Sequence, residues 1–223
     1  MDKEQLISVI TEKVVQQLSG MIESSAPKST KYTKKKIPLG ISNRHVHIAQ
    51  DDFKILFGKE AEISKLRDLS QPGQYVCEQM VTLVGPKGVI EKVRILGPYR
   101  KKTQVEVSVS DCFKLGVKAP IRDSGDLEGS ASITLVGPAG SLTLKEGCII
   151  AARHIHMTPD DANYYGVIDG ERVNVRGIGN RGVVFLDVLV RVSPKYVLEM
   201  HLDIDEANAA ALKNGDLLEI FEV

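Results

Sequence analysis

Apolar residues follow two different patterns along the chain, and the pattern changes after residue 36. In the first 18 residues an apolar side chain recurs at every fourth position, at Leu6, Ile10, Val14 and Leu18. Residues four apart share one face of a helix, so this spacing predicts an amphipathic helix over residues 1–18. Residues 19–36 are rich in glycine, serine and lysine and predict a flexible linker. We expect such a tethered helix to bury its apolar face against a partner; the alternative is packing against its own core.

From Ile37 onward, short runs of valine, isoleucine and leucine alternate with polar residues and end at glycine, proline or aspartate. This two-residue period predicts β-strands. The predicted strands are Val81–Val84, Val89–Leu96, Val105–Val109, Ile133–Val136, Val173–Val175, Val183–Val192, Tyr196–Leu202 and Leu217–Val223. Many short strands with few and short helices favour β-barrels or a sandwich.

Three internal repeats narrow this choice. Residues 41–52 match residues 150–161 without gaps, residues 81–88 match 133–140, and the segment from His156 is repeated from His201. The copies at His47, His156 and His201 each read as a strand end followed by a helix start, as in Thr158-Pro-Asp-Asp, which offers an N-cap and a proline at the first helical position. The repeats predict a mainly β fold of two related β-barrels capped by short helices.

The charge and cysteine content exclude several functions. The 29 basic residues balance the 29 acidic ones, so no overall field attracts nucleic acid or an anionic membrane. No apolar run approaches the ~18 residues of a membrane span. The three cysteines Cys77, Cys112 and Cys148 form no C-x-x-C motif and are too few for a disulfide framework, so we expect core thiols and a soluble cytoplasmic protein. The Gly177–Gly182 segment fits G-x-G-x-x-G, but no helix is predicted after it, which favours a hairpin turn.

All five histidines lie in the repeated unit. Residues i and i+2 of a strand project from one face, so each His-x-His aims two imidazoles at one point, as metal sites require. The pairs are His45 with His47 and His154 with His156. His201 lies on the polar face of its predicted strand and is a candidate third ligand for the second pair.

The first pair needs a third ligand of its own. Glu106 is the candidate, because its neighbours Val105 and Val107 point the other way; the alternative is an ordinary surface residue of a strand. Three protein ligands leave a coordination position open, which is typical of catalytic zinc. Arg100 begins a basic run that can hold an anionic substrate, although a solvated basic loop explains the same residues.

Four motifs resemble those of one known family. Residues 42–47, 96–100, 104–106 and 152–156 are similar to segments of the propanediol-utilisation-type phosphate propanoyltransferases, the phosphotransacylases of bacterial microcompartments. The resemblance covers residues 37–223. The N-terminal helix and linker resemble the encapsulation peptide of that family.

The resemblance implies a specific site. It implies two zinc ions per chain, one on His45, His47 and Glu106 and the other on His154, His156 and His201. It places the substrate phosphate on Arg100. It places coenzyme A near Ile41, Ser42, Asn43, Lys87, Arg94 and Asn208. It also implies that residues 37–43 and 152–223 form the first barrel and that residues 44–151 form a second, inserted barrel.

The implied reaction converts an acyl-CoA (propanoyl-CoA or acetyl-CoA) and phosphate to an acyl phosphate and coenzyme A. The implied location is the lumen of a cytoplasmic bacterial microcompartment, where the N-terminal helix contacts shell or core proteins, and the expected assembly is a homodimer or higher homo-oligomer. Two alternatives remain from the residues. A zinc-dependent thioester hydrolase would not need phosphate, and a non-catalytic metal-binding compartment scaffold would release no thiol.

Overall fold

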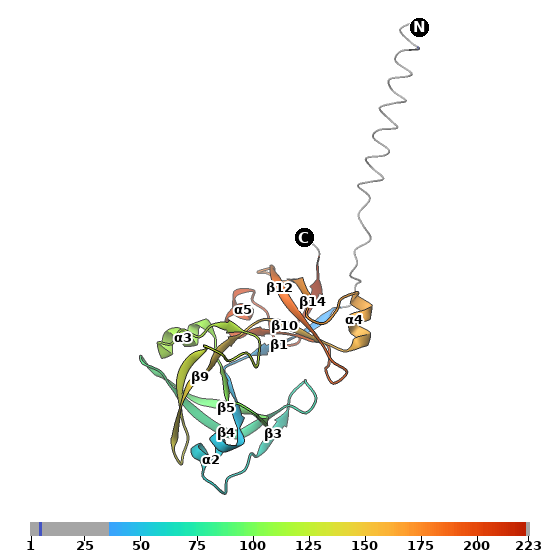
Figure 1. Ribbon diagram of the computed structural model, residues 1–223. Coiled ribbons are helices and arrows are strands. Elements are labelled where there is room, and N and C mark those ends of the chain that lie inside the picture. The colour runs from blue at the N-terminus through green and yellow to red at the C-terminus, as the bar shows by residue number, and fades with distance from the viewer. Residues whose placement is uncertain (1–4, 6–35, 222–223) are drawn as a thin grey trace. The chain divides into compact units, whose positions relative to one another are not determined.

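The computed structural model describes residue 5 and residues 36–221, which form a mainly β structure with a few short helices (Figure 1). The predicted helix over residues 1–18 and the predicted linker over residues 19–36 therefore lie almost entirely outside the described residues. Within the described ranges, none of the helices has the length and apolar character needed to cross a membrane.

The first barrel is a closed ring of six strands. Its pairing order is β1-β13-β10-β12-β11-β14, with β14 pairing back onto β1. The chain enters this ring once before the second barrel and returns to it afterwards. The strands are β1 (Ile37–Ser42), β10 (His154–Met157), β11 (Arg172–Gly177), β12 (Val183–Val192), β13 (Glu199–Asp203) and β14 (Leu217–Ile220).

The second barrel is also a ring of six strands. The pairing runs β2-β5-β4-β8-β9-β6 and returns to β2. These strands are β2 (His45–Ala49), β4 (Tyr75–Val84), β5 (Val89–Arg100), β6 (Gln104–Glu106), β8 (Ala131–Val136) and β9 (Ser141–Ala151). Two further strands extend the ring at its margins: β3 (Lys65–Asp68) pairs with β4, and β7 (Ile121–Arg122) pairs with β9.

The two rings have the same internal plan, which confirms the prediction of two related barrels. In the second barrel, β2 lies between a parallel partner, β5, and an antiparallel partner, β6. In the first barrel, β10 lies between the parallel β12 and the antiparallel β13. The two His-x-His strands therefore occupy equivalent positions, and this explains why residues 41–52 and 150–161 are similar.

Short helices follow equivalent strands in both barrels. They are α2 (Gln50–Phe57), α3 (Val109–Leu115), α4 (Pro159–Tyr165) and α5 (Ile204–Ala209). Helices α2 and α4 follow the two histidine strands, and α3 and α5 follow their antiparallel partners. Thr158 caps α4 in a reciprocal capping box with Asp161, and Pro159 is the first helical residue, as the sequence predicted.

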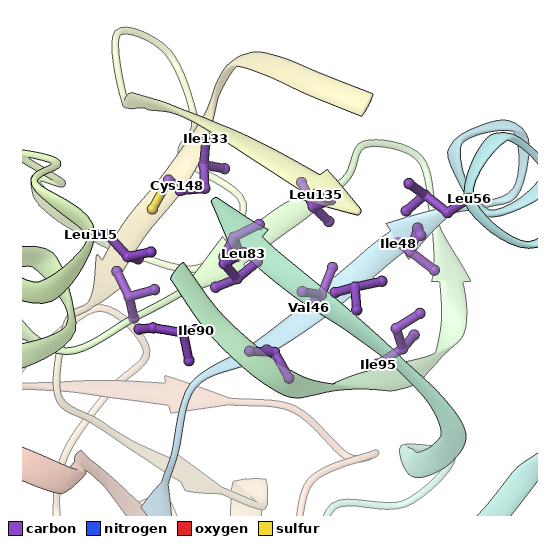
Figure 2. Packing of buried hydrophobic residues seen from close by; sticks show 14 of the residues in the cluster. Val46, Ile48, Leu56, Leu83, Ile90, Ile95, Leu115, Ile133, Leu135 and Cys148 are labelled. Atoms are coloured by element: carbon purple, nitrogen blue, oxygen red, sulfur yellow. The ribbon is translucent and has the colours of Figure 1, made fainter. Parts of the chain in front are cut away.

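The core of the second barrel fixes which way the histidines point. Val46 and Ile48 of β2 are fully buried among aliphatic side chains from the surrounding strands, including Leu83 (Figure 2). Burying each such side chain contributes about 1.5–3 kcal/mol. Because neighbouring residues of a strand face opposite sides, His45 and His47 point away from this core.

The repeated Gly-Pro-x-Gly turns each donate a backbone hydrogen bond to a carbonyl near the C-terminal end of a helix. Between β4 and β5, the Lys87 N–H donates to the carbonyl of Leu115 at the end of α3, and between β8 and β9, the Ala139 N–H donates to that of Leu56 in α2. A methyl group on Gly85 would lie 2.2 Å from the Leu115 oxygen, and one on Gly137 2.4 Å from the Leu56 oxygen. Residues 81–88 and 133–140 are thus similar because each forms a turn that packs closely against the backbone of a helix.

Three details of the sequence analysis can be judged here. The predicted strand Val105–Val109 is wrong at its end: β6 stops at Glu106, because the Ser108 hydroxyl accepts a hydrogen bond from the Asp111 N–H and starts α3. The Gly177–Gly182 segment is a hairpin turn between antiparallel β11 and β12, as expected. The three cysteines are free and buried, and burial raises the pKa of Cys148 to about 12, so they are core thiols.

We expect Gly85→Ala and Gly137→Ala each to lower the free energy of unfolding by about 1–3 kcal/mol, because the new methyl group overlaps a backbone oxygen. Chemical denaturation measures the change. Gly179→Ala is the matched control, since nothing lies within 4 Å of its added methyl group, and it should change stability by less than about 0.5 kcal/mol. Equal effects at all three glycines would contradict this account of the turns.

Candidate metal and anion site

The two histidine strands meet at one cavity of about 850 Å³, whose lining comes from both barrels. All five histidines line it. Its size suits a small-molecule or cofactor site, for which about 300–1,000 Å³ is usual. Within it, two groups of three side chains offer ligand atoms that lie within 4.8 Å of one another. We refer to His45, His47 and Glu106 as the Glu106 cluster, and to His154, His156 and His201 as the His201 cluster.

The Glu106 cluster is built by two paired strands. His45 and His47 are on β2, and Glu106 is directly opposite His45 on the antiparallel β6. The Nε2 atoms of the two histidines are 3.2 Å apart. The Glu106 carboxylate reaches both, at 3.4 Å from His45 Nε2 and 3.6 Å from His47 Nε2. Glu106 is therefore buried with the first histidine pair and is not a surface residue.

The His201 cluster has the same construction in the other barrel. His201 on β13 is directly opposite His154 on β10. The ring centroids are 4.8 Å apart for His154 and His156, 5.0 Å for His154 and His201, and 4.9 Å for His156 and His201. Glu106 and His201 thus hold the same position in the two strand ladders, although they are 95 residues apart in the sequence and differ in chemistry.

Backbone contacts fix the ring orientation of the leading histidine in each cluster. His45 Nδ1 lies 2.8 Å from the carbonyl oxygen of Asn43, and His154 Nδ1 lies 2.8 Å from that of Ala152. A carbonyl only accepts, so each Nδ1 carries the proton and each Nε2 keeps a lone pair. This is the tautomer that metal ligation through Nε2 requires.

An arginine precedes the leading histidine in each barrel and anchors the crossing between barrels. Arg44 Nε donates to both carboxylate oxygens of Asp111 at 2.8 Å, and Arg153 donates to Glu206 at 2.6 Å. Both acids lie in the first turn of a helix, α3 or α5. The same anchor thus holds the start of both histidine strands.

The electrostatics of the His201 cluster favour neutral imidazoles. Burial, with help from the neighbouring histidines, lowers the pKa of His154 to about 4 and that of His156 to about 3. Burial disfavours the charged form of an imidazole, and a second imidazolium nearby would add repulsion. Near neutral pH, these two rings therefore carry lone pairs and no charge.

The Glu106 cluster contains a carboxylate among its imidazoles. Burial alone would raise the pKa of the Glu106 carboxyl, but His45, His47 and Arg100 together hold it well below its ordinary value. Burial likewise opposes protonation of His45, yet the adjacent Glu106 carboxylate raises the pKa of this ring overall. For His47, burial and the charge on His45 lower the pKa. This cluster thus contains one anionic ligand, which the other cluster lacks.

Arg100 lies beside the Glu106 cluster. Its guanidinium is 2.9 Å from His47 Nε2 and donates to the Ser124 hydroxyl at 3.0 Å. The following Lys101 and Lys102 are exposed. Arg100 therefore belongs to the cavity, whereas the two lysines form the solvated part of the basic run.

The residues that the resemblance assigned to coenzyme A divide into two groups. Ile41, Ser42, Asn43 and Arg94 line the cavity. Lys87 and Asn208 are absent from its lining among the described residues: Lys87 is in the turn against α3, and Asn208 is on α5.

Several cavity residues were not identified from the sequence. Arg191 stands opposite His156 on β12, and Tyr196 stacks on the His156 ring with centroids 4.2 Å apart. Arg191 carries a weak signal, since it is a cation close to the end of the apolar run of β12. Glu199 carries one too, because it lies two residues before His201 and so shares its face. Gln104 has the same spacing from Glu106 and donates a hydrogen bond to it, but is outside the cavity lining.

Comparison with known proteins agrees with the resemblance of the motifs. Residues 38–213 match the family model described as phosphate propanoyltransferase. A phosphate propanoyltransferase of Thermotoga maritima is 54% identical over 187 residues, which are 83% of this chain and 89% of the relative. One of Priestia megaterium is 50% identical over 224 residues, which are 100% of this chain and 99% of the relative. The chain therefore belongs to the phosphate propanoyltransferase family and is an acyltransferase.

Proposed function

We propose that this protein converts a short-chain acyl-CoA, such as propanoyl-CoA or acetyl-CoA, and phosphate to the acyl phosphate and coenzyme A at a two-zinc site. The observation that carries the proposal is the meeting of two three-ligand clusters and Arg100 in one cavity. A Lewis acid and an anion holder close together would assist the transfer of an acyl group from a thioester to phosphate, and the cavity has the residues to hold both.

The donor sets fit zinc. Imidazole and carboxylate are common zinc ligands, and two ligands about 2.1 Å from a tetrahedral ion lie about 3.4 Å apart. The separations of 3.2, 3.4 and 3.6 Å in the Glu106 cluster suit that spacing. In the His201 cluster, His156 Nδ1 and His201 Nε2 are buried with no hydrogen-bond partner in the described part of the chain, which is costly unless a ligand satisfies them.

Both clusters supply three protein ligands, which leaves room for substrate atoms. When bound there, zinc would polarise the thioester carbonyl and stabilise the departing thiolate. The protein's own contribution is to hold the ligands in place through the carbonyls of Asn43 and Ala152 and through the two arginine anchors. These contacts orient the site before any substrate arrives.

Arg100 is the residue that we propose holds phosphate. Its planar guanidinium offers paired donors to a phosphate, and Ser124, already 3.0 Å away, adds a hydroxyl on the same side. Holding phosphate beside the thioester makes the attack effectively intramolecular. In the reaction, a phosphate oxygen forms the new bond to the carbonyl carbon, the carbon–sulfur bond breaks, and its electron pair leaves on sulfur.

We propose that coenzyme A lies along the lining formed by Ile41, Ser42, Asn43 and Arg94. Ile41 and Ser42 end β1, Asn43 follows them at the crossing into the second barrel, and Arg94 is on β5 opposite His45. Lys87 and Asn208, outside this lining, can contact only parts of the ligand that extend beyond the cavity.

Initial rates of thiol release test the proposed reaction. We expect wild-type protein to release free thiol from propanoyl-CoA only when phosphate is present, with one acyl phosphate formed per thiol. Equal release without phosphate would indicate a thioester hydrolase, and no release would indicate a metal-binding scaffold. Either result would refute the proposal.

Arg100→Ala should reduce the phosphate-dependent rate by roughly 30- to 1000-fold. This corresponds to about 2–4 kcal/mol, the usual cost of removing a donor to a developing charge. Arg100→Lys should also be poor, because an ammonium cannot make the paired contact. Lys101→Ala is the control, since this neighbour is exposed, and zinc content should be unchanged in all three variants. An unchanged phosphate KM and kcat for Arg100→Ala would place the anion elsewhere.

His154→Ala should lose the metal of the His201 cluster and keep the other, so that zinc content falls from about two to about one per chain. Activity should fall by more than about 100-fold, because losing only a residue that hydrogen-bonds a metal ligand already costs roughly 10–100-fold. Elemental analysis and circular dichroism of the purified protein give the readouts, and Glu128→Ala, at an exposed position, is the control. Wild-type protein without zinc, cobalt or iron would rule out the metal site.

We also propose, from the sequence of residues 1–36, that the N-terminal segment directs a homodimer or higher oligomer into a bacterial microcompartment by contacting shell or core proteins. Deleting residues 1–20 should leave the rate of thiol release unchanged and abolish co-sedimentation with purified compartments. A truncated protein that still co-sediments would contradict this role. So would one that no longer folds, because the segment would then belong to the core.

A further inference from the structure

A polar residue lies two positions before the third member of each cluster, on the same strand and the same face. Gln104 precedes Glu106 on β6, and Glu199 precedes His201 on β13. The two are equivalent in the strand ladders, because Gln104 is opposite His47 and Glu199 is opposite His156.

Gln104 is held so that its amide N–H groups face the cluster. The side chain is buried, and its Oε1 accepts a hydrogen bond from the Gly125 N–H at 2.8 Å. This fixes which end of the amide is which. Its Nε2 donates to Glu106 Oε1 at 2.6 Å and to the Ser124 hydroxyl at 2.9 Å. The contact presents a donor to an anionic ligand.

Glu199 presents the opposite chemistry. Its Oε2 is 3.0 Å from His201 Nε2, and it accepts hydrogen bonds from the Ser70 hydroxyl at 2.5 Å and the Gln71 amide at 3.2 Å. Gly40 on the adjacent β1 leaves room for the carboxylate, since a methyl group there would lie 2.9 Å from Glu199 Cδ. The contact presents an anion to an imidazole.

Ser70 and Gln71 come from the second barrel, in the connection between β3 and β4, whereas Glu199 is in the first barrel. Gln71 is buried, and its amide also pairs with the backbone of Val197, donating to the carbonyl at 3.0 Å and accepting from the N–H at 3.2 Å. The orientation of Glu199 therefore depends on the docking of one barrel against the other.

We propose that Gln104 and Glu199 are positioning residues, each matched in polarity to the cluster member beside it: a donor beside the carboxylate of Glu106, and a carboxylate beside the imidazole of His201. The match gives each cluster one carboxylate within 3.6 Å of a cluster nitrogen: Glu106 as a member of one, and Glu199 beside a member of the other. Exchanging the amide and the carboxylate between positions 104 and 199 would place the wrong group beside each cluster. A carboxylate at position 104 would face Glu106 and repel it, and an amide at position 199 would remove the negative charge beside His201.

The inference rests on the proposed function, because it assumes that both clusters bind zinc. The test is a zinc titration of the full-length protein against a competing chelator, which gives a dissociation constant for each of two equivalents. Glu199→Gln should weaken one equivalent by about 10–100-fold and leave the other unchanged, as is usual when an outer partner of a ligand is lost. Gln104→Glu should weaken the other equivalent by a similar factor. The variant His154→Ala, which removes a cluster member, identifies which equivalent belongs to the His201 cluster.

Matched exchanges away from the cavity serve as controls. Glu219→Gln removes a carboxylate that pairs with Arg176 on the barrel surface, and Gln79→Glu changes an amide that bonds the Glu62 carbonyl. Both should leave the two zinc constants within about threefold of wild type. If Gln104→Glu fails to fold, as judged by circular dichroism in the absence of metal, Gln104→Ala removes the donor without adding a charge and should weaken the same equivalent.

A compensating pair separates positioning from a purely structural role. Combining Gln104→Glu with Glu106→His places a carboxylate two residues before a histidine, which is the arrangement of the other barrel. This double variant should bind zinc at the altered cluster at least about tenfold more tightly than Gln104→Glu alone. Tenfold is the lower limit of the weakening expected for Gln104→Glu. A structural defect at position 104 would persist in both.

The outcomes distinguish the two proposals. Wild-type protein that binds no zinc overturns both the metal site and the positioning role. Wild-type protein that binds two equivalents, with both unchanged in Glu199→Gln and Gln104→Glu, overturns the positioning role alone. A double variant no tighter than Gln104→Glu also overturns the matched chemistry.

Discussion

The two-residue period of the β-strand is the constraint on which the site depends. Val46 and Ile48 fill the core of the second barrel, so His45 and His47 have to face the cavity. A slip of one residue in the pairing of β2 would put both imidazoles into the aliphatic core and both aliphatic side chains into the polar cavity. Burying the two imidazoles in the core without partners would cost several kcal/mol each, so the packing that holds the barrel together also fixes the ligands.

Repetition of this unit produces two clusters in one cavity, and their third members make them unequal. The position opposite the leading histidine is Glu106 in one barrel and His201 in the other. One cluster thus carries a ligand charge and an adjacent guanidinium, that of Arg100, while the other consists of three imidazoles, two of which, His154 and His156, have lowered pKa values. Two ions bound there would differ in charge environment although the backbone around them is the same. This division suits a reaction with two different substrates.

The sequence predicted the site residues whose positions depend on neighbours in the sequence, and missed those whose partners are distant in the sequence. The His-x-His pairs were predictable because a spacing of two is local, and Glu106 and His201 because their apolar neighbours show which face they occupy. Arg191, Glu199 and Gln104 were missed because their partners depend on strand register and on contacts such as Ser70 with Glu199, which are 129 residues apart. The end of the strand after Glu106 was misjudged for a local reason, since the Ser108 cap interrupts an otherwise alternating pattern.

The cavity exists only while the barrels are docked, so the contacts between them are part of the site. The chain crosses from one barrel to the other just before each histidine pair, and Arg44 and Arg153 anchor these crossings to the starts of α3 and α5. Those two helix starts also touch, because the Ser110 N–H donates to Asp205 at 2.7 Å. On another side, Gln71 and Ser70 reach across to Val197 and Glu199. Ligands, crossings and interface thus share one hydrogen-bond network, and loosening the docking would separate the two clusters.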